Sequence, residues 1–141
     1  MDKGAVVNEL ISKELFCSVM GYPLEEVRNL TELESNSEDG VIYIKFWGRY
    51  VGGVKPEHGQ CSFKQRYINI YELAHKCKVW AGDLDYVIQT GVRLDGTKEF
   101  DVLCIHKNQD IEDDESIYYQ DTLEKEPDSI FAACEWLREQ L

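Results

Sequence analysis

Apolar residues follow a helical period in three segments of the chain. Within residues 5–20 the apolar positions recur at this spacing, and Gly-Tyr-Pro at 21–23 ends the pattern. A second stripe runs from Ile70 to Ala81, with Asn69 placed to cap its first turn. A third stripe runs from Ile130 to Leu141. These patterns predict an N-terminal, a central and a C-terminal helix.

Between these segments, short runs rich in β-branched and aromatic residues predict strands. The runs are 41–47, 85–93, 98–107 and 116–122. Asp95-Gly96, between the second and third runs, is a strong hairpin signal. The polar segment 28–40 is expected to be a connecting loop, and the glycine-rich segment 48–66 a long loop excursion with room for a short edge strand at either end.

The order of these elements predicts an α+β fold. We expect a single domain over residues 1–141, with a mainly antiparallel sheet of about four or more strands layered against three α-helices. Apolar residues make up 43% of the 141 residues, which is enough to build one core without metal or disulfide support. The net charge of −12 does not change this expectation.

The charge is unevenly distributed along the chain. Residues 1–44 hold three basic and nine acidic residues, residues 45–78 hold seven basic and two acidic residues, and residues 79–141 hold five basic and sixteen acidic residues. The acidic total disfavours direct binding of nucleic acids, because phosphate backbones are repelled over long distances. A local basic patch within 45–78 could still hold a small anion or the acidic face of another protein.

Neither a membrane span nor a metal site is expected. No apolar run approaches the ~20 residues that cross a bilayer, so we expect a cytoplasmic protein. The five cysteines are odd in number and widely spaced, and none belongs to a Cys-x-x-Cys pair. We therefore expect free, mostly buried thiols, with no metal ion and no cofactor.

A histidine and a cysteine lie close together in the central helix, as His75 and Cys77. Successive helical residues turn by about 100°, so these two side chains point about 200° apart and cannot form a nucleophile–base pair. Cys77 falls on the apolar stripe and His75 on the polar side. No other catalytic motif is present, so a binding protein is favoured over an enzyme.

Two clusters are candidate binding sites. The first mixes cations with aromatic rings, which suits anionic or aromatic ligands: Arg49, Tyr50, Lys55, His58, Lys64, Arg66 and Tyr67. Its cations could instead only balance the acidic excess of the chain. The second is an acidic loop: Asp110, Glu112, Asp113, Asp114 and Glu115. A calcium loop of the EF-hand type would need glycine at 115 and glutamate at 121. The acidic loop is therefore either a solvated charge run or a surface that imitates phosphates for a basic partner.

Both ends of the chain carry a family resemblance. The segment VVNELISKELFCSVMGYP ends at Met20, Gly21 and Tyr22, and the segment YYQDTLEKEPDSIFAACEWLREQL closes the chain. The first resembles the opening helix, and the second the closing strand, turn and helix, of a family of small phage and prophage proteins described as an ABA-sandwich domain. This resemblance implies packing and capping features and no catalytic residues. A phage origin suggests a protein that modulates a host protein or counters a host defence.

These observations lead to two hypotheses. The leading hypothesis is a non-enzymatic phage-type binding protein that acts in the bacterial host cytoplasm and inhibits a host protein or complex, such as a nucleic-acid-handling defence complex. The alternative is a small-molecule sequestering protein that binds an anionic, nucleotide-like ligand through the basic aromatic segment 48–67. Self-association into a homo-oligomer is left open.

Overall fold

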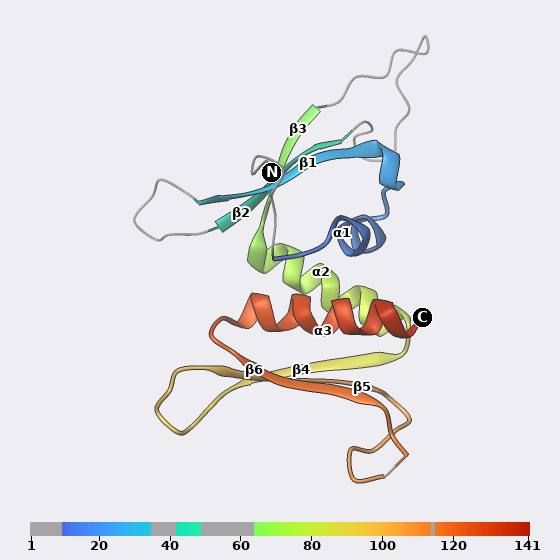
Figure 1. Ribbon diagram of the computed structural model, residues 1–141, viewed down its shortest axis with the longest axis vertical. Helices are drawn as coiled ribbons and strands as arrows, with labels where there is room; N and C mark the ends of the chain where they lie inside the picture. Colours follow the sequence, from blue (N-terminus) through green and yellow to red (C-terminus); the bar gives the residue numbers. More distant parts are fainter. Residues whose placement is uncertain (1–9, 35–41, 49–63, 114) are drawn as a thin grey trace, which may run out of the picture. The chain divides into compact units, whose positions relative to one another are not determined.

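The chain divides into two compact units, residues 1–72 and residues 73–141. The computed structural model describes residues 10–34, 42–48, 64–113 and 115–141. These residues form three α-helices, one short 3₁₀ helix and six strands. Each unit is described by itself below (Figure 1). The expectation that the whole chain is one domain stays a prediction.

The first unit opens with helix α1, Lys13–Met20. Ser12 has extended backbone angles, and its side chain accepts a hydrogen bond from Leu15 N at 3.1 Å, so the helix begins directly after this cap. Gly21 ends it in the left-handed conformation, at φ 81°. A helix was predicted over 5–20, but residues 10–12 are not helical and the helix begins only at Lys13. Residues 5–9 lie outside the described part.

A three-stranded antiparallel sheet follows in the same unit. Its strands are β1 (Val27–Glu34), β2 (Ile42–Gly48) and β3 (Lys64–Asn69), in the order β1-β2-β3. The 3₁₀ helix η2 (Leu24–Glu26) leads into β1. Helix α1 lies on one face of the sheet, where the rings of Phe16 and Phe46 meet edge to face at 4.9 Å (Figure 1). Ile44 and Phe46, two positions apart on β2, both lie on this buried face.

Strand β1 corrects a sequence prediction, because segment 28–40 was expected to be a loop. The structure places residues 27–34 in a strand, and 35–41 lie outside the described residues. The register shifts between Arg28 and Thr31, and Asn29 has a positive φ of 56°. Such a bulge inserts an extra residue and breaks the period of two. The strand was missed because the bulge hides its alternation and its composition is polar.

The second unit takes most of helix α2 (Ile70–Asp83), which begins in the first unit. The side chain of Asn69 accepts a hydrogen bond from Tyr71 N at 2.7 Å, which confirms the predicted cap. After α2 come strands β4 (Tyr86–Val92), β5 (Phe100–His106) and β6 (Tyr118–Leu123), and then helix α3 (Glu126–Gln140). The sheet is antiparallel in the order β4-β5-β6, as a series of hairpins.

The turn between β4 and β5 has the predicted hairpin residues. Gly96 adopts a positive φ of 88°, and the Asp95 side chain accepts hydrogen bonds from Thr97 N at 3.0 Å and Thr97 Oγ1 at 2.7 Å. Arg93 N donates to Glu99 O at 2.8 Å and closes the loop below the turn. The hairpin is confirmed, with a longer loop than a two-residue turn.

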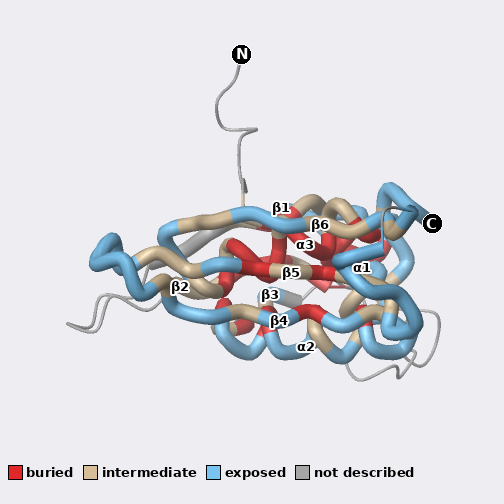
Figure 2. Tube along the Cα trace, turned by 90° about the horizontal axis from the view of Figure 1, so that it is seen from below, coloured by how far each residue is buried: buried red, intermediate tan, exposed pale blue. Residues whose placement is uncertain are grey.

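Helix α3 covers one face of the second sheet. The Trp136 ring packs against Tyr86 of β4 at 6.5 Å and Tyr119 of β6 at 6.0 Å. The Thr90 hydroxyl of β4 donates to Glu126 Oε2 of the helix. Buried positions gather along α3 and the central strand β5 (Figure 2). The inner face of this sheet and α3 therefore enclose the core of the second unit.

The α+β class is confirmed, whereas a single sheet of four or more strands is not found in the described residues. The six described strands form two sheets of three. The fourteen residues of α2 separate β3 from β4, and β4 then pairs with the strand that follows it through a short connection. Among the described residues, no helix is both long enough and apolar enough to cross a membrane.

Candidate functional site

The face of the first sheet opposite α1 is the candidate site. Side chains directly opposite each other in an antiparallel pair share one face of the sheet. One row on this face consists of Arg28, Trp47 and Gln65, and the next of Thr31, Lys45 and Tyr67. Tyr43 continues the face along β2. We call these seven residues the aromatic face: Arg28, Thr31, Tyr43, Lys45, Trp47, Gln65 and Tyr67.

Strand alternation sets the spacing of the aromatic face. Tyr43, Lys45 and Trp47 occupy every second position of the central strand, so neighbours along it lie roughly 6.6 Å apart. Tyr67 stands beside Lys45 on the adjacent strand. A cation therefore lies between three aromatic rings. An aromatic ligand could stack on one of these rings while its anionic group meets the ammonium of Lys45.

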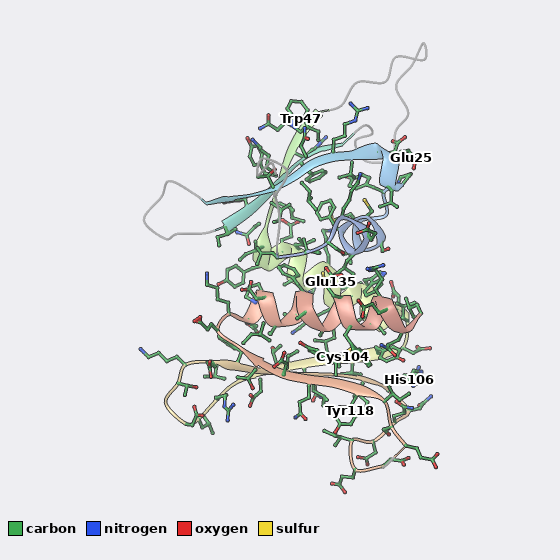
Figure 3. All side chains as sticks on the ribbon, in the orientation of Figure 1. Glu25, Trp47, Cys104, His106, Tyr118 and Glu135 are labelled. Carbon is green, nitrogen blue, oxygen red and sulfur yellow. The ribbon has the colours of Figure 1, made fainter. Side chains whose placement is uncertain are left out.

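The aromatic face is accessible. Tyr67 is 53% exposed although it lies in a strand, and its hydroxyl accepts a hydrogen bond from Gln65 Nε2 at 2.5 Å. Trp47 is partly exposed and projects from the side of the sheet away from α1 (Figure 3). Arg28 is exposed in the same row as Trp47. Two of the seven residues, Lys45 and Arg28, are basic and none is acidic, in a chain of net charge −12.

The predicted ligand-binding set is only partly described, and strand β3 divides the residues that are. Arg49, Tyr50, Lys55 and His58 lie outside the described residues. Lys64, Arg66 and Tyr67 all belong to β3. Tyr67 lies on the aromatic face, but Arg66 pairs with Phe46 and shares the face that α1 covers. Arg66 and Tyr67 therefore do not act on one ligand from the same side of the sheet.

The sequence prediction includes only Tyr67 of the aromatic face and misses the other six members: Arg28, Thr31, Tyr43, Lys45, Trp47 and Gln65. Three of them carry a readable signal, because in VIYIKFW the polar or amphipathic side chains occupy alternate positions. The same alternation that predicts the strand places Tyr43, Lys45 and Trp47 together on its second face. Arg28 could not be found in this way, since the β1 bulge hides the strand that holds it.

The acidic loop between β5 and β6 forms a set of local turns. The Asp110 side chain accepts from Glu112 N at 3.0 Å, and the Asp113 side chain accepts from Glu115 N at 3.1 Å. Ser116 Oγ closes the loop on Asp110 O at 2.7 Å. All four of these acidic residues are exposed, and Asp114 lies outside the described residues. The loop therefore presents its carboxylates to solvent.

His75 and Cys77 take the positions that their helical spacing predicted. Cys77 is fully buried and His75 is exposed, so they do not form a catalytic pair. Hydrogen bonding of the Cys134 thiol to Cys77 and burial raise the pKa of Cys134, and burial raises the pKa of the Cys104 thiol to about 12. These thiols stay protonated and act as apolar core groups.

Four of the five cysteines, Cys17, Cys77, Cys104 and Cys134, are free and buried, whereas Cys61 lies outside the described residues. Across the part of the chain that the structure describes, no three His, Cys, Asp or Glu side chains group as metal ligands. Cys104 lies between its strand and α3 (Figure 3). That the protein needs no metal or cofactor stays a prediction.

Comparisons with protein-family models, with curated proteins and with solved structures find no match to this chain.

Proposed function

We propose that the protein is a non-enzymatic binding protein that captures an anionic, nucleotide-like ligand on its aromatic face. The observation that carries this proposal is the placement of Lys45 among Tyr43, Trp47 and Tyr67 on one accessible side of a three-stranded sheet. An aromatic base stacks on such rings, and each stacked base contributes roughly 1–3 kcal/mol of binding free energy. The neighbouring cation attracts the phosphate.

The charge distribution favours a small ligand over a polymer. A nucleic-acid strand carries a negative charge at every phosphate and is repelled over long distances by the acidic excess of the chain, with nine acidic residues in 1–44 and sixteen in 79–141. A mononucleotide carries only a few negative charges, and it is small enough to lie beside the basic residues of the aromatic face. The proposed ligand class is therefore a free nucleotide or a small aromatic phosphate.

Ligand titration tests this proposal. Mononucleotides, cyclic nucleotides and inorganic phosphate are each titrated into the full chain, with binding measured by calorimetry. We expect nucleotides to bind and inorganic phosphate alone to bind far more weakly, because it cannot stack. Trp47→Ala should weaken nucleotide binding by about tenfold or more, through loss of one stacking surface.

A matched pair of tyrosines provides the control. Tyr67→Ala changes the aromatic face, whereas Tyr71→Ala removes a tyrosine of similar exposure, 60% against 53%, from helix α2. Only the Tyr67 variant should lose affinity. Equal affinity for wild type, Trp47→Ala and Tyr67→Ala would exclude the aromatic face as the nucleotide site.

A second function is favoured by the exposed carboxylates of the acidic loop. We propose, on this observation and on the phage resemblance of both chain ends, that the protein also binds a basic host protein in the bacterial cytoplasm and inhibits it. Asp113→Asn with Glu115→Gln removes two charges while an amide oxygen at 113 can still accept the turn hydrogen bond. Loss of host-protein binding in this folded variant supports the second function, and unchanged binding argues against it.

A further inference from the structure

The second sheet also has a face that no helix or strand of its unit covers. Three rows of side chains cross it, as the strand registers show. The first row is apolar and aromatic, the second places a leucine between two amides, and the third is small and polar. In order, the rows are Val87, Ile105 and Tyr118; Gln89, Leu103 and Gln120; and Gly91, Asp101 and Thr122. We call these nine residues the graded face.

A hollow of about 240 Å³ lies over the second and third rows. Its lining includes Gln89, Gly91, Asp101, Leu103 and Gln120. The space over Gly91 is open, since a Cβ added there would meet no atom within 4 Å. Two amides and one carboxylate therefore surround an open space with a leucine beside it.

The charges around the graded face are predominantly acidic. Residues 85–122 hold ten acidic and three basic residues. Two of the basic residues are already paired. Arg93 faces Asp95 at 3.2 Å and Asp101 Oδ1 at 3.8 Å, and Lys107 faces Asp85 at 3.1 Å. The acidic loop follows β5 and lies on the side of the sheet away from α3, next to the apolar row (Figure 1). Carboxylates thus flank the apolar row at one end and the hollow at the other.

We propose that the graded face docks an arginine-bearing basic segment of another protein. The guanidinium enters the hollow, where Asp101 Oδ2 and the amide oxygens of Gln89 and Gln120 accept its hydrogen bonds. The other oxygen, Asp101 Oδ1, already accepts from Thr122 and faces Arg93. An apolar side chain of the same segment covers Val87, which is 39% exposed, together with Ile105 and Tyr118. A second copy of this chain is a poor occupant, because residues 79–141 hold sixteen acidic and only five basic residues and two such units repel each other.

The planar guanidinium also explains why arginine is favoured over lysine. Its five donors can reach a carboxylate and two amides at once, whereas an ammonium carries three donors on a compact charge. The docking surface extends the second function proposed above. The class of partner, a basic protein, is taken from that proposed function. It adds the sheet surface, the hollow and the arginine, none of which belongs to the acidic loop.

The test is a selection of short random peptides, displayed as a library, against the full chain. We expect the selected peptides to be enriched in arginine beside an apolar residue and to lose affinity when arginine is changed to lysine. Gly91→Lys should abolish their binding, because it fills the hollow and pairs with Asp101. Gly82→Lys is the matched control, since it adds the same charge at an open, exposed position of α2.

A second variant keeps the inference testable if Gly91→Lys misfolds. Asp101→Asn removes the carboxylate but retains an oxygen for the hydrogen bond that Thr122 Oγ1 donates at 2.8 Å. It should weaken the selected peptides by about tenfold, because hydrogen bonds to a charged group contribute more than neutral ones. Circular dichroism confirms that each variant remains folded.

The outcomes separate the docking surface from the second function. If peptide binding is lost in Asp113→Asn with Glu115→Gln but unchanged in Gly91→Lys and Asp101→Asn, the graded face is excluded and the acidic loop alone binds. If the selected peptides carry no basic residues, the graded face is excluded as a docking site for a basic segment. Loss in the graded-face variants with Gly82→Lys unaffected supports the inference.

Discussion

The aromatic face and the graded face are built on the same local architecture and have opposite chemistry. Each is a side of a three-stranded antiparallel sheet that no described helix or strand of its own unit covers, and the other side is buried by a helix, α1 in the first unit and α3 in the second. The first presents rings with Lys45 and Arg28, and the second presents apolar groups, amides and Asp101.

This comparison shows that one supporting pattern can present two kinds of recognition surface. The buried positions of both sheets are apolar and alternate with the presented ones, so they specify the sheet and leave the outer positions free to vary. The chemistry that each sheet presents is therefore encoded at every second residue, and function has to be argued from those residues and not from the fold.

The largest expected effect on stability comes from removing a core side chain that packs beneath the aromatic face. Phe16→Ala removes the ring that meets Phe46 between α1 and the first sheet, and it should lower the free energy of unfolding by about 3–5 kcal/mol. Urea denaturation measures the loss. Hydrogen exchange should show lower protection in β1–β3 than in β4–β6, and equal loss in both sheets would show that they unfold together.

The contact between α2 and α3, where the Cys134 thiol donates to Cys77 O at 3.7 Å, is tested by Cys77→Asp. Cys77 is fully buried in α2, so an unpaired carboxylate there should cost on the order of 3 kcal/mol. His75→Ala, on the exposed side of the same helix, should change stability by less than ~0.5 kcal/mol. Thermal denaturation of both variants checks this order, and the reverse order would mean that the helix presents its other side to the core.

The comparison is sharpened by reversing one charge on each side of the first sheet. Lys45→Glu should weaken nucleotide binding roughly tenfold, because a contact in the aromatic face becomes repulsive. Arg66→Glu, on the α1 side, should leave affinity nearly unchanged once the folded fraction is accounted for. Calorimetric titration at low and at moderate salt distinguishes them. A larger loss in Arg66→Glu would place the ligand on the other side of the sheet.

The smallest expected effect is a pH dependence of the second unit. Burial, and then the hydrogen bond that Tyr119 donates to Asp121, raise the pKa of Tyr119 to about 12. Since a free tyrosine has a pKa of about 10, this contribution is fully present below pH ~10 and is lost as the pH rises toward ~12. The side chain is only partly buried, so the effect should stay below about 1 kcal/mol.

Denaturation of wild type and Tyr119→Phe across this pH range measures the difference. Cys104, whose pKa burial raises to about 12, also loses stabilisation toward high pH in both proteins, so only the difference between them reports on Tyr119. The variant should show the shallower decline. Identical curves would mean that the Tyr119 phenol is not perturbed by folding.

Much of the local structure was determined by the sequence itself. The apolar stripe of α2, its Asn69 cap and the Asp95-Gly96 hairpin all arise from interactions among residues close in the chain. For the same reason the separation of His75 from Cys77 followed from helix geometry alone.

Tertiary structure decided which strands pair in each sheet and which residues lie together on its outer face. Strand pairing joins residues far apart in sequence, so Tyr67 could come beside Lys45 and Arg28 beside Trp47 only once the registers were set. The polar strand β1 is held by its pairing with β2 and not by its own propensity, which is why it was mistaken for a loop. Likewise, nothing local indicates that Gly91 opens a hollow beside Asp101 and Gln120, because the three residues meet only across the sheet.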